Sequence, residues 1–153
     1  DIESREIEAD DVSRYFGGTV DVTGFQIADA VMNRHGSQAL RLLRLAEGTD
    51  GARLGPATVA SLTNSVRQLV AVATAPAGMS ERDLAVHAKV PPWKLRTLNQ
   101  QARRWSQRDL AYAIVILGDL DAGMKGGLRE GEQLEPVQKG LALESAVVSL
   151  ASS

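Results

Sequence analysis

The sequence contains no cysteine, and its two histidines, His35 and His87, stand far apart. The absence of cysteine excludes disulfides, thiolate-bound metals and cysteine nucleophiles. Two isolated histidines do not supply the three or four ligands that a zinc ion requires. We therefore expect a chain with no metal site and no cofactor.

Long apolar runs are also missing. No stretch approaches the ~18 to 20 apolar residues of a membrane-spanning helix, and the opening residues DIESREIEADD lack the basic start and apolar core of an export signal. These absences predict a cytoplasmic location. Because the sequence starts with Asp1 and not with Met, we also expect it to be a segment of a longer protein.

Motifs for phosphate binding and catalysis are absent as well. The sequence has no G-x-x-x-x-G-K-[ST] element, and the KGG at Lys125 has the wrong order for a phosphate loop. A lysine followed by glycines is typical of a helix end, and a subunit contact is the alternative for Lys125. Ser37, Ser80 and Ser106 fall at predicted helix starts, where serine caps free backbone N–H groups, and none belongs to a nucleophile motif. We expect no catalytic residue and no intrinsic activity.

What the sequence does contain is the material of a helical domain. Its 153 residues are 44% hydrophobic and 24% charged but only 4% aromatic, which suits one globular domain with a sizeable core. After Pro56, apolar residues recur at helical spacing, at Val59, Leu62, Val66, Leu69 and Ala73. This pattern predicts an amphipathic helix from Pro56 to Ala73.

Weaker versions of the same pattern predict the other helices. They are expected over residues 7–16, 25–32, 37–48, 80–88, 93–105, 106–124 and from about residue 132 onward. The segment TVDVT at 19–23 is predicted to be an extended connector, and GTDGARLGP at 48–56 a loop. Because no segment is expected to pair into a sheet, the sequence predicts an all-α fold, an orthogonal helical bundle.

One segment, residues 80–106, is locally basic and resembles a helix-turn-helix. If it bound DNA, the contacts would come from Lys94, Arg96, Arg103 and Arg104. This is the main alternative function, a DNA-binding regulatory domain.

Two features of the segment count against specific DNA recognition. Trp93, Leu95 and Leu98 fill much of the half of the second helix that would face the bases, and Lys89 stands at the turn position where glycine is usual. A solvated basic face or a subunit contact explains the arginines equally well. We expect both tryptophans, Trp93 and Trp105, to lie in the core.

Several stretches resemble, in order and spacing, the C-terminal region of bacterial DNA polymerase III delta subunits, particularly those of actinobacterial type. I-x-A-D-D-V-S-R-Y-F-G-G at Ile7–Gly18 is similar to the end of the family's lid domain, and V-T-G-F-Q-I-A-D-A at Val22–Ala30 to the entry of its last domain. The segments at Pro91–Ser106, Leu117–Gly127 and Ala142–Val147 resemble later parts of that domain. The resemblance covers nearly the whole chain.

The resemblance implies a clamp-loader subunit that acts in DNA replication. Residues 1–20 would be the tail of the lid domain and a linker, and residues 21–153 the C-terminal collar domain that joins the other clamp-loader subunits. Binding and opening of the sliding clamp would belong to an N-terminal AAA+-like domain that these residues do not include. The family lacks ATP hydrolysis, so the chain would be a nucleotidyltransferase component only through membership of the polymerase holoenzyme.

The last predicted helix is apolar on more than one side. Its apolar residues form two neighbouring stripes, Leu134, Val137, Leu141 and Val148 on one and Leu143, Val147 and Leu150 on the other. We expect Leu143, Val147 and Leu150, together with Lys125, to contact other subunits. The alternative is a central helix wrapped by its own neighbours.

Overall fold

The computed structural model describes residues 18–125 and 136–152 of the chain. Within these ranges all regular structure is helical, which confirms the predicted all-α fold. The elements are α2 (Gly18–Met32), α3 (Gly36–Ala73), α4 (Glu81–Ala88), the 3-10 helix η1 (Pro92–Lys94), α5 (Leu95–Ala102), α6 (Gln107–Lys125) and α7 (Pro136–Ser152). The predicted helix at 7–16, most of the proposed lid-domain tail and Leu134 lie outside the described residues.

Helix α2 begins earlier than the sequence suggested, so the extended connector predicted at 19–23 is wrong. The helix continues through Gly24, where a Cβ atom would lie 3.2 Å from both the carbonyl oxygen of Ala57 and the Oγ of Ser61. Glycine is therefore needed here for close approach of two helices and not for a chain break. The helix therefore includes TVDVT despite the strand propensity of its valines and threonines.

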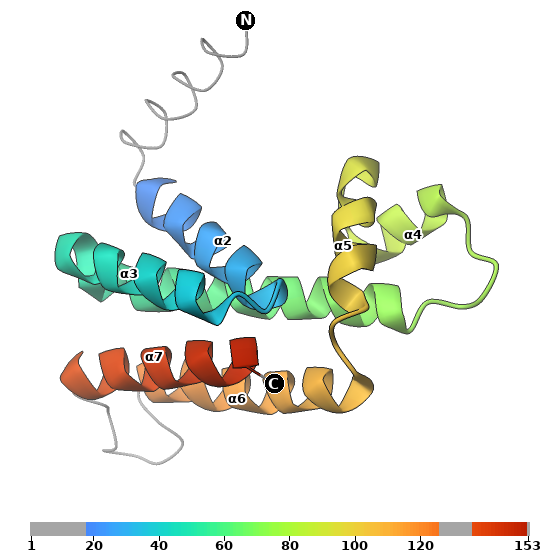
Figure 1. Cartoon of the computed structure of the whole chain (residues 1–153). Coiled ribbons are helices and arrows are strands. Elements are labelled where there is room, and N and C mark those ends of the chain that lie inside the picture. Colours follow the sequence, from blue (N-terminus) through green and yellow to red (C-terminus); the bar gives the residue numbers. More distant parts are fainter. Residues whose placement is uncertain (1–17, 126–135, 153) are drawn as a thin grey trace, which may run out of the picture.

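The loop predicted at 48–56 is also wrong, because α3 stays helical from Gly36 to Ala73 with Pro56 inside it. The helix nevertheless doubles back (Figure 1). A straight helix would place Ser61 about 37 Å from Gly36, whereas the chain from Gly24 to Gly36 spans about 26 Å at most. Since Ser61 touches Gly24, the direction must reverse between the first arm of α3, residues 36–47, and its second arm, residues 54–73.

The helices form two layers with a small unit at one end (Figure 1). Helix α2 and the two arms of α3 make the upper layer, the antiparallel helices α6 and α7 make the lower one, and α4, η1 and α5 stand at the end where α3 finishes. The core lies between these elements. Its largest fully buried side chains include Ile27, Met32, Leu43, Leu54, Leu62, Leu69, Leu98 and Leu150.

The predicted caps of α4 and α6 are confirmed. The Oγ of Ser80 accepts a hydrogen bond from the N–H of Asp83 at 3.1 Å. At α6, the Oγ of Ser106 accepts from the N–H of Asp109 at 3.0 Å, and an Asp109 carboxylate oxygen accepts from the N–H of Ser106 at 3.0 Å. Each pair satisfies backbone donors that a helix start leaves free.

The stripe expected to face other subunits lies instead in the core. Leu143 is 3% exposed, and Val147 and Leu150 are fully buried. The reason is that α7 packs against both α3 and α6, which cover this side of the helix. Of the α7 residues that the sequence singled out and whose side chains the structure describes, Leu141 and Val148 are exposed.

Candidate functional site

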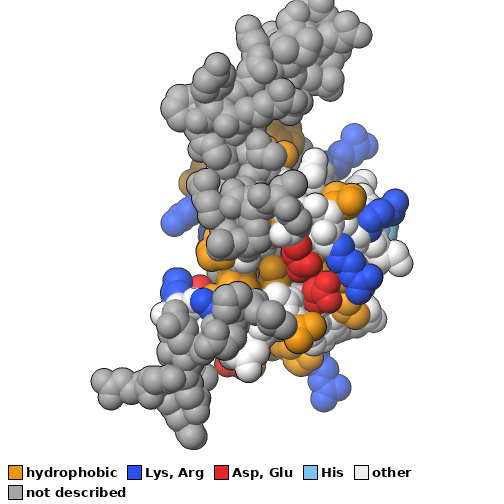
Figure 2. Space-filling model, turned by 90° about the vertical axis from the view of Figure 1, so that its left-hand side faces the viewer, with side chains coloured by type: hydrophobic (Ala, Val, Ile, Leu, Met, Phe, Trp, Pro, Cys, Tyr) orange, Lys and Arg blue, Asp and Glu red, His pale blue; other side chains and the backbone are white. Residues whose placement is uncertain are grey.

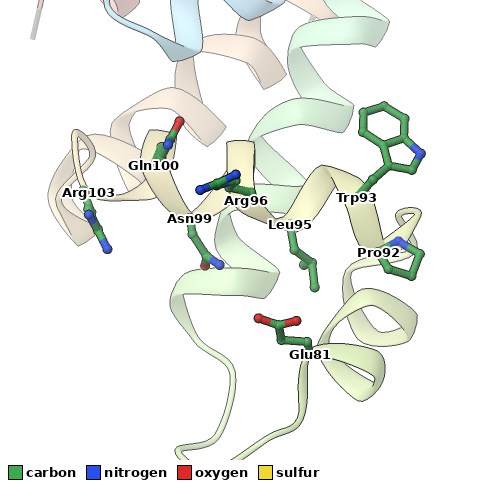
Figure 3. Close-up of a pocket in the computed structure, with 8 residues that line it drawn as sticks. All are labelled: Glu81, Pro92, Trp93, Leu95, Arg96, Asn99, Gln100 and Arg103. Carbon is green, nitrogen blue, oxygen red and sulfur yellow. The ribbon is translucent and has the colours of Figure 1, made fainter.

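An open pocket of about 510 Å³ lies beside α4 and α5. Its lining consists of Glu81, Pro92, Trp93, Leu95, Arg96, Asn99, Gln100 and Arg103 (Figure 3). The indole of Trp93, at one edge, belongs to a residue that is 76% exposed, and Arg103 lies at the opposite end. An exposed aromatic ring combined with arginines and amides offers groups for stacking on a base and for binding phosphate.

The turn before this pocket has a defined geometry. The N–H of Val90 donates to the carbonyl of Ala85 at 3.0 Å, and the N–H of Lys89 donates to the carbonyl of Val86 at 3.2 Å. This is a Schellman-type helix end, and Lys89 occupies its left-handed position with φ of 58°. The chain thus forms the turn with lysine where glycine is usual.

The exposure of Trp93 corrects the expectation that both tryptophans are core residues. Leu95 and Leu98 of α5 are buried against the bundle, and Trp93, on the preceding 3-10 turn, points away from that buried side. Trp105 is 6% exposed, as expected. Its Nε1–H donates to the carbonyl of Met32 at 2.9 Å, which satisfies the buried indole donor.

The four basic residues proposed as DNA contacts divide into two groups. Arg96 and Arg103 are exposed and line the pocket. Lys94 is half-buried and does not line it, and Arg104 points the other way, donating from Nη1 to the carbonyl of Asn33 at 2.6 Å. The structure therefore brings two of the four together with Trp93. Glu81 in the pocket wall opposes an anion placed next to it.

A second cluster, which sequence reasoning missed, is centred on Arg34 in the turn between α2 and α3. Its Nη2 forms an ion pair with a carboxylate oxygen of Asp109 at 3.0 Å, its Nε donates to the carbonyl of Arg104 at 3.3 Å, and its Nη1 donates to the carbonyl of Leu150. The guanidinium also lies 3.4 Å from the centre of the Trp105 ring. One side chain thus contacts α6, α7 and the connection between α5 and α6.

The backbone of Arg34 repeats the geometry found at Lys89. The N–H of His35 donates to the carbonyl of Ala30 at 2.8 Å, and the N–H of Arg34 donates to the carbonyl of Val31 at 2.9 Å. Arg34 has φ of 61°. A basic residue just after a helix is ordinary, so nothing in the sequence pointed to this cluster.

Arg34 and Asp109 each favour the charged form of the other. Burial lowers the pKa of the Arg34 guanidinium, and the Asp109 carboxylate opposes this. The pKa of Asp109 is lowered chiefly by the hydrogen bond from the N–H of Ser106, with further lowering from the Ser106 hydroxyl and Arg34. Asp109 therefore stays ionised at neutral pH, where it both caps α6 and holds Arg34.

Exposed apolar side chains gather on α6 and α7. Tyr112, Ile114 and Val115 of α6 and Leu141 and Val148 of α7 are between 42% and 62% exposed. The hydroxyl groups of Tyr112 and Ser149 are 3.0 Å apart, which links the flanks of the two helices. Ile114 lies about 160° around α6 from Tyr112, so we call the other four apolar residues, Tyr112, Val115, Leu141 and Val148, the α6–α7 outer face.

Lys125 ends α6 and is exposed. It forms an i,i+4 ion pair with Asp121 at 3.2 Å, an arrangement that leaves most of the lysine accessible.

On the end of the molecule where α3 reverses, acidic, basic and hydrophobic side chains lie next to one another (Figure 2). The side chains visible there do not form a surface of one charge sign.

The part of the chain that the structure describes has no group of three or more histidine or acidic side chains able to hold a metal ion. In the same residues, no helix is both long and apolar enough to cross a membrane.

Comparison with protein-family models gives a match to the DNA polymerase III delta subunit, C-terminal domain, over residues 21–135. This range covers three quarters of the chain. The chain belongs to this family. The comparisons with curated proteins and with solved structures gave no match.

Within the delta-subunit domain, the matched range contains the pocket and all of the Arg34 cluster except Leu150. It includes the pocket beside α5 and the turn that carries Arg34, and it ends one residue before α7 begins. The family match confirms the resemblance to delta subunits and connects the chain with DNA replication.

Proposed function

We propose that this domain is the assembly part of a clamp loader, joining the C-terminal domains of the other subunits in a collar. The observation that carries the proposal is the family match over residues 21–135. The whole delta subunit would contribute no nucleotide chemistry and would be a cytoplasmic member of the polymerase holoenzyme. Binding and opening of the sliding clamp would lie in an N-terminal domain of the full-length subunit, and residues 1–20 would be the end of its lid domain.

The surface that best fits a subunit contact is the α6–α7 outer face. Monomeric proteins seldom expose several large apolar side chains together unless a partner covers them. Tyrosine in particular is enriched in the cores of protein interfaces. Lys125, at the end of the same helix as Tyr112 and Val115, would add a charged contact at the rim.

The assembly proposal is tested by the double substitution Val115→Glu with Leu141→Glu. Both residues are more than 60% exposed, so the isolated domain should keep its helicity and cooperative unfolding. Gel filtration with the purified C-terminal domains of the other clamp-loader subunits should show loss of co-elution. Two buried carboxylates without partners would account for the loss.

Val86→Glu is the matched control. Val86 is 74% exposed on α4, away from the α6–α7 outer face, and its substitution should leave co-elution unchanged. Co-elution of the Val115→Glu, Leu141→Glu variant at the wild-type level would show that this face is not the contact.

A second candidate function, contact with single-stranded nucleic acid, is favoured by the exposure of Trp93 beside Arg96 and Arg103. An unpaired base can stack on an exposed indole while arginines bind the adjoining phosphates. Duplex reading by α5 fits less well, because α5 has eight residues and buries Leu95 and Leu98. Such binding would be sensitive to salt and largely independent of sequence.

The second candidate is tested by anisotropy with a fluorescent oligothymidylate at low salt. Trp93→Ala should weaken binding by about 5- to 150-fold, the loss of one base stack of 1 to 3 kcal/mol, and Arg103→Ala should weaken it through loss of a phosphate contact. Arg41→Ala, an exposed arginine on α3, is the control and should change affinity little. A sequence-selective duplex complex that persists at high salt would favour the regulatory-domain alternative instead.

A further inference from the structure

The two candidate surfaces belong to different parts of the molecule, and both parts touch the turn at residues 32–35. From the α5 side, Gln101 donates to the Asn33 side chain at 3.5 Å, Arg104 donates to the Asn33 carbonyl and Trp105 donates to the Met32 carbonyl. From the other side, Asp109 of α6 and the Leu150 carbonyl of α7 bind Arg34.

We propose that Arg34 is a positioning residue that fixes the orientation of α4, η1 and α5, here the α4–α5 unit, relative to the α6–α7 pair. Residues 103–106 connect the α4–α5 unit to α6 along the chain. Arg34 contacts this connection twice: its guanidinium stacks over the Trp105 ring, and its Nε donates to the Arg104 carbonyl. It also forms an ion pair with Asp109 in the first turn of α6. Its Nη1 donates to the Leu150 carbonyl of α7.

The chemistry of these contacts suits arginine and no other residue. Five N–H donors in a rigid plane reach acceptors in several directions, while the flat face stacks on an aromatic ring. A lysine at this position would retain a charge near Asp109 but would present a single nitrogen to all the acceptors. The arginine side chain is also only 12% exposed, so its contacts are largely shielded from competing water.

Arg34 also occupies a strained backbone conformation. Residues with a side chain disfavour positive φ, and glycine is the usual occupant of this helix-end position. The chain keeps arginine there with φ of 61°. At Lys89 the same strained geometry occurs, but that side chain is exposed, which provides an internal comparison.

The competing explanation is that the apolar core alone orients α5. Leu95 and Leu98 are buried and α5 contacts α3 directly. If those contacts suffice, removing the guanidinium should leave the angle of the α4–α5 unit unchanged.

Spin-label distances in the 153-residue chain distinguish the two explanations. Because the chain has no cysteine, labels can be placed at will. The reporting pair is Arg82→Cys on α4 with Gly118→Cys on α6; Arg82 is exposed, and a Cβ at Gly118 meets nothing within 4 Å. A second pair, Gly118→Cys with Ser145→Cys on α7, reports on α6 and α7 alone.

In the Arg34→Met and Arg34→Lys backgrounds, the α4 to α6 distance distribution should become about twice as wide, as several ångströms of added motion would require. The α6 to α7 distribution should keep its wild-type width. Arg44→Met, which removes the exposed Arg44–Glu144 ion pair of 3.3 Å between α3 and α7, is the control and should alter neither.

The proposal is overturned if the α4 to α6 distribution in both Arg34 variants matches that of Arg44→Met. Equal broadening of both label pairs would also overturn it, because Arg34 would then act as a general stabilising residue. If Arg34→Met does not fold, Arg34→Lys decides alone. The functional importance of this orientation rests on the two proposed surfaces. The distances themselves are measured without nucleic acid or partner, so they test the role of Arg34 even if the proposed function is wrong.

Discussion

Replacing Arg34 and, separately, Lys89 with glycine separates the cost of left-handed backbone from the contribution of the Arg34 side chain. Both residues occupy the same position of a Schellman-type helix end, with φ of 61° and 58°. Glycine removes the steric cost of that conformation, which is about 1 to 2 kcal/mol. Glycine also makes the unfolded chain more flexible, which lowers the free energy of unfolding by about 0.5 to 1 kcal/mol.

For Lys89→Gly these two effects leave a net stabilisation of about 0.5 to 1 kcal/mol. The Lys89 side chain is exposed and its loss should matter little. For Arg34→Gly the same backbone gain is offset by loss of the guanidinium. Hydrogen bonds from a charged group contribute about 1.5 to 3 kcal/mol, and the stacking on Trp105 about 0.5 to 1 kcal/mol.

Asp109 is 27% exposed, so we count its ion pair with Arg34 at the low end of that range. The expected net effect of Arg34→Gly is a destabilisation of about 2 kcal/mol. The two glycine variants should therefore differ by about 3 kcal/mol in the free energy of unfolding. Urea unfolding followed by far-UV circular dichroism measures this difference, provided that the m-value is the same for both variants.

Equal stabilisation by both glycines would refute the reasoning, since it would mean that the Arg34 contacts contribute nothing to stability. A rise in stability for Arg34→Gly with a fall for Lys89→Gly would contradict the reading of both helix ends. Arg34→Lys should be destabilised about as much as Arg34→Gly, because it loses most of the acceptors without the backbone relief that glycine brings.

Further substitutions test other parts of the structure. Because folding lowers the pKa of Asp109, its ionised form stabilises the fold fully at pH values above its pKa in the unfolded chain, and this stabilisation is lost as pH falls through its pKa in the folded protein. The free energy of unfolding should therefore fall less on acidification in Asp109→Asn than in wild type. Leu150→Ala, at a fully buried position, should cost about 2 to 5 kcal/mol in chemical unfolding, whereas Leu141→Ala should stay within about 0.5 kcal/mol. Ser80→Ala should cost about 1 kcal/mol through loss of the α4 cap, and an unchanged midpoint would show that the cap is dispensable.

The helical periodicity of the sequence predicted the fold class and most helix positions correctly, because one apolar face must be buried for each helix. The face at Val59, Leu62, Val66 and Leu69 is buried as the spacing indicates. Local hydrogen-bond chemistry was predicted correctly at Ser80 and Ser106, whereas the predicted cap at Ser37 is wrong, because α3 begins at Gly36 and His35 is its N-cap residue. These features depend on residues within a few positions of one another.

Features that depend on distant residues could not be predicted in this way. Gly, Asp and Pro in residues 48–56 indicated a loop; the chain does reverse direction between the two arms of α3, but helical backbone continues on both sides of the reversal with no extended loop between them. The Arg34 cluster joins residues that are 70 to 116 positions apart in the sequence. No local pattern distinguishes such an arginine from a solvated one.

Helix α7 shows why the sequence pattern could not tell which of its two apolar stripes is buried within the domain. Leu141 and Val148 are seven residues apart, and so are Leu143 and Leu150, so the two stripes have the same helical period and periodicity cannot rank them. Their neighbours decide: α3 and α6 cover Leu143 and Leu150, leaving Leu141 and Val148 exposed beside Tyr112 and its partner Ser149. A contact with another subunit through this helix must therefore use the exposed stripe, and a charge at Leu141 should block assembly while a charge at Leu143 should unfold the domain.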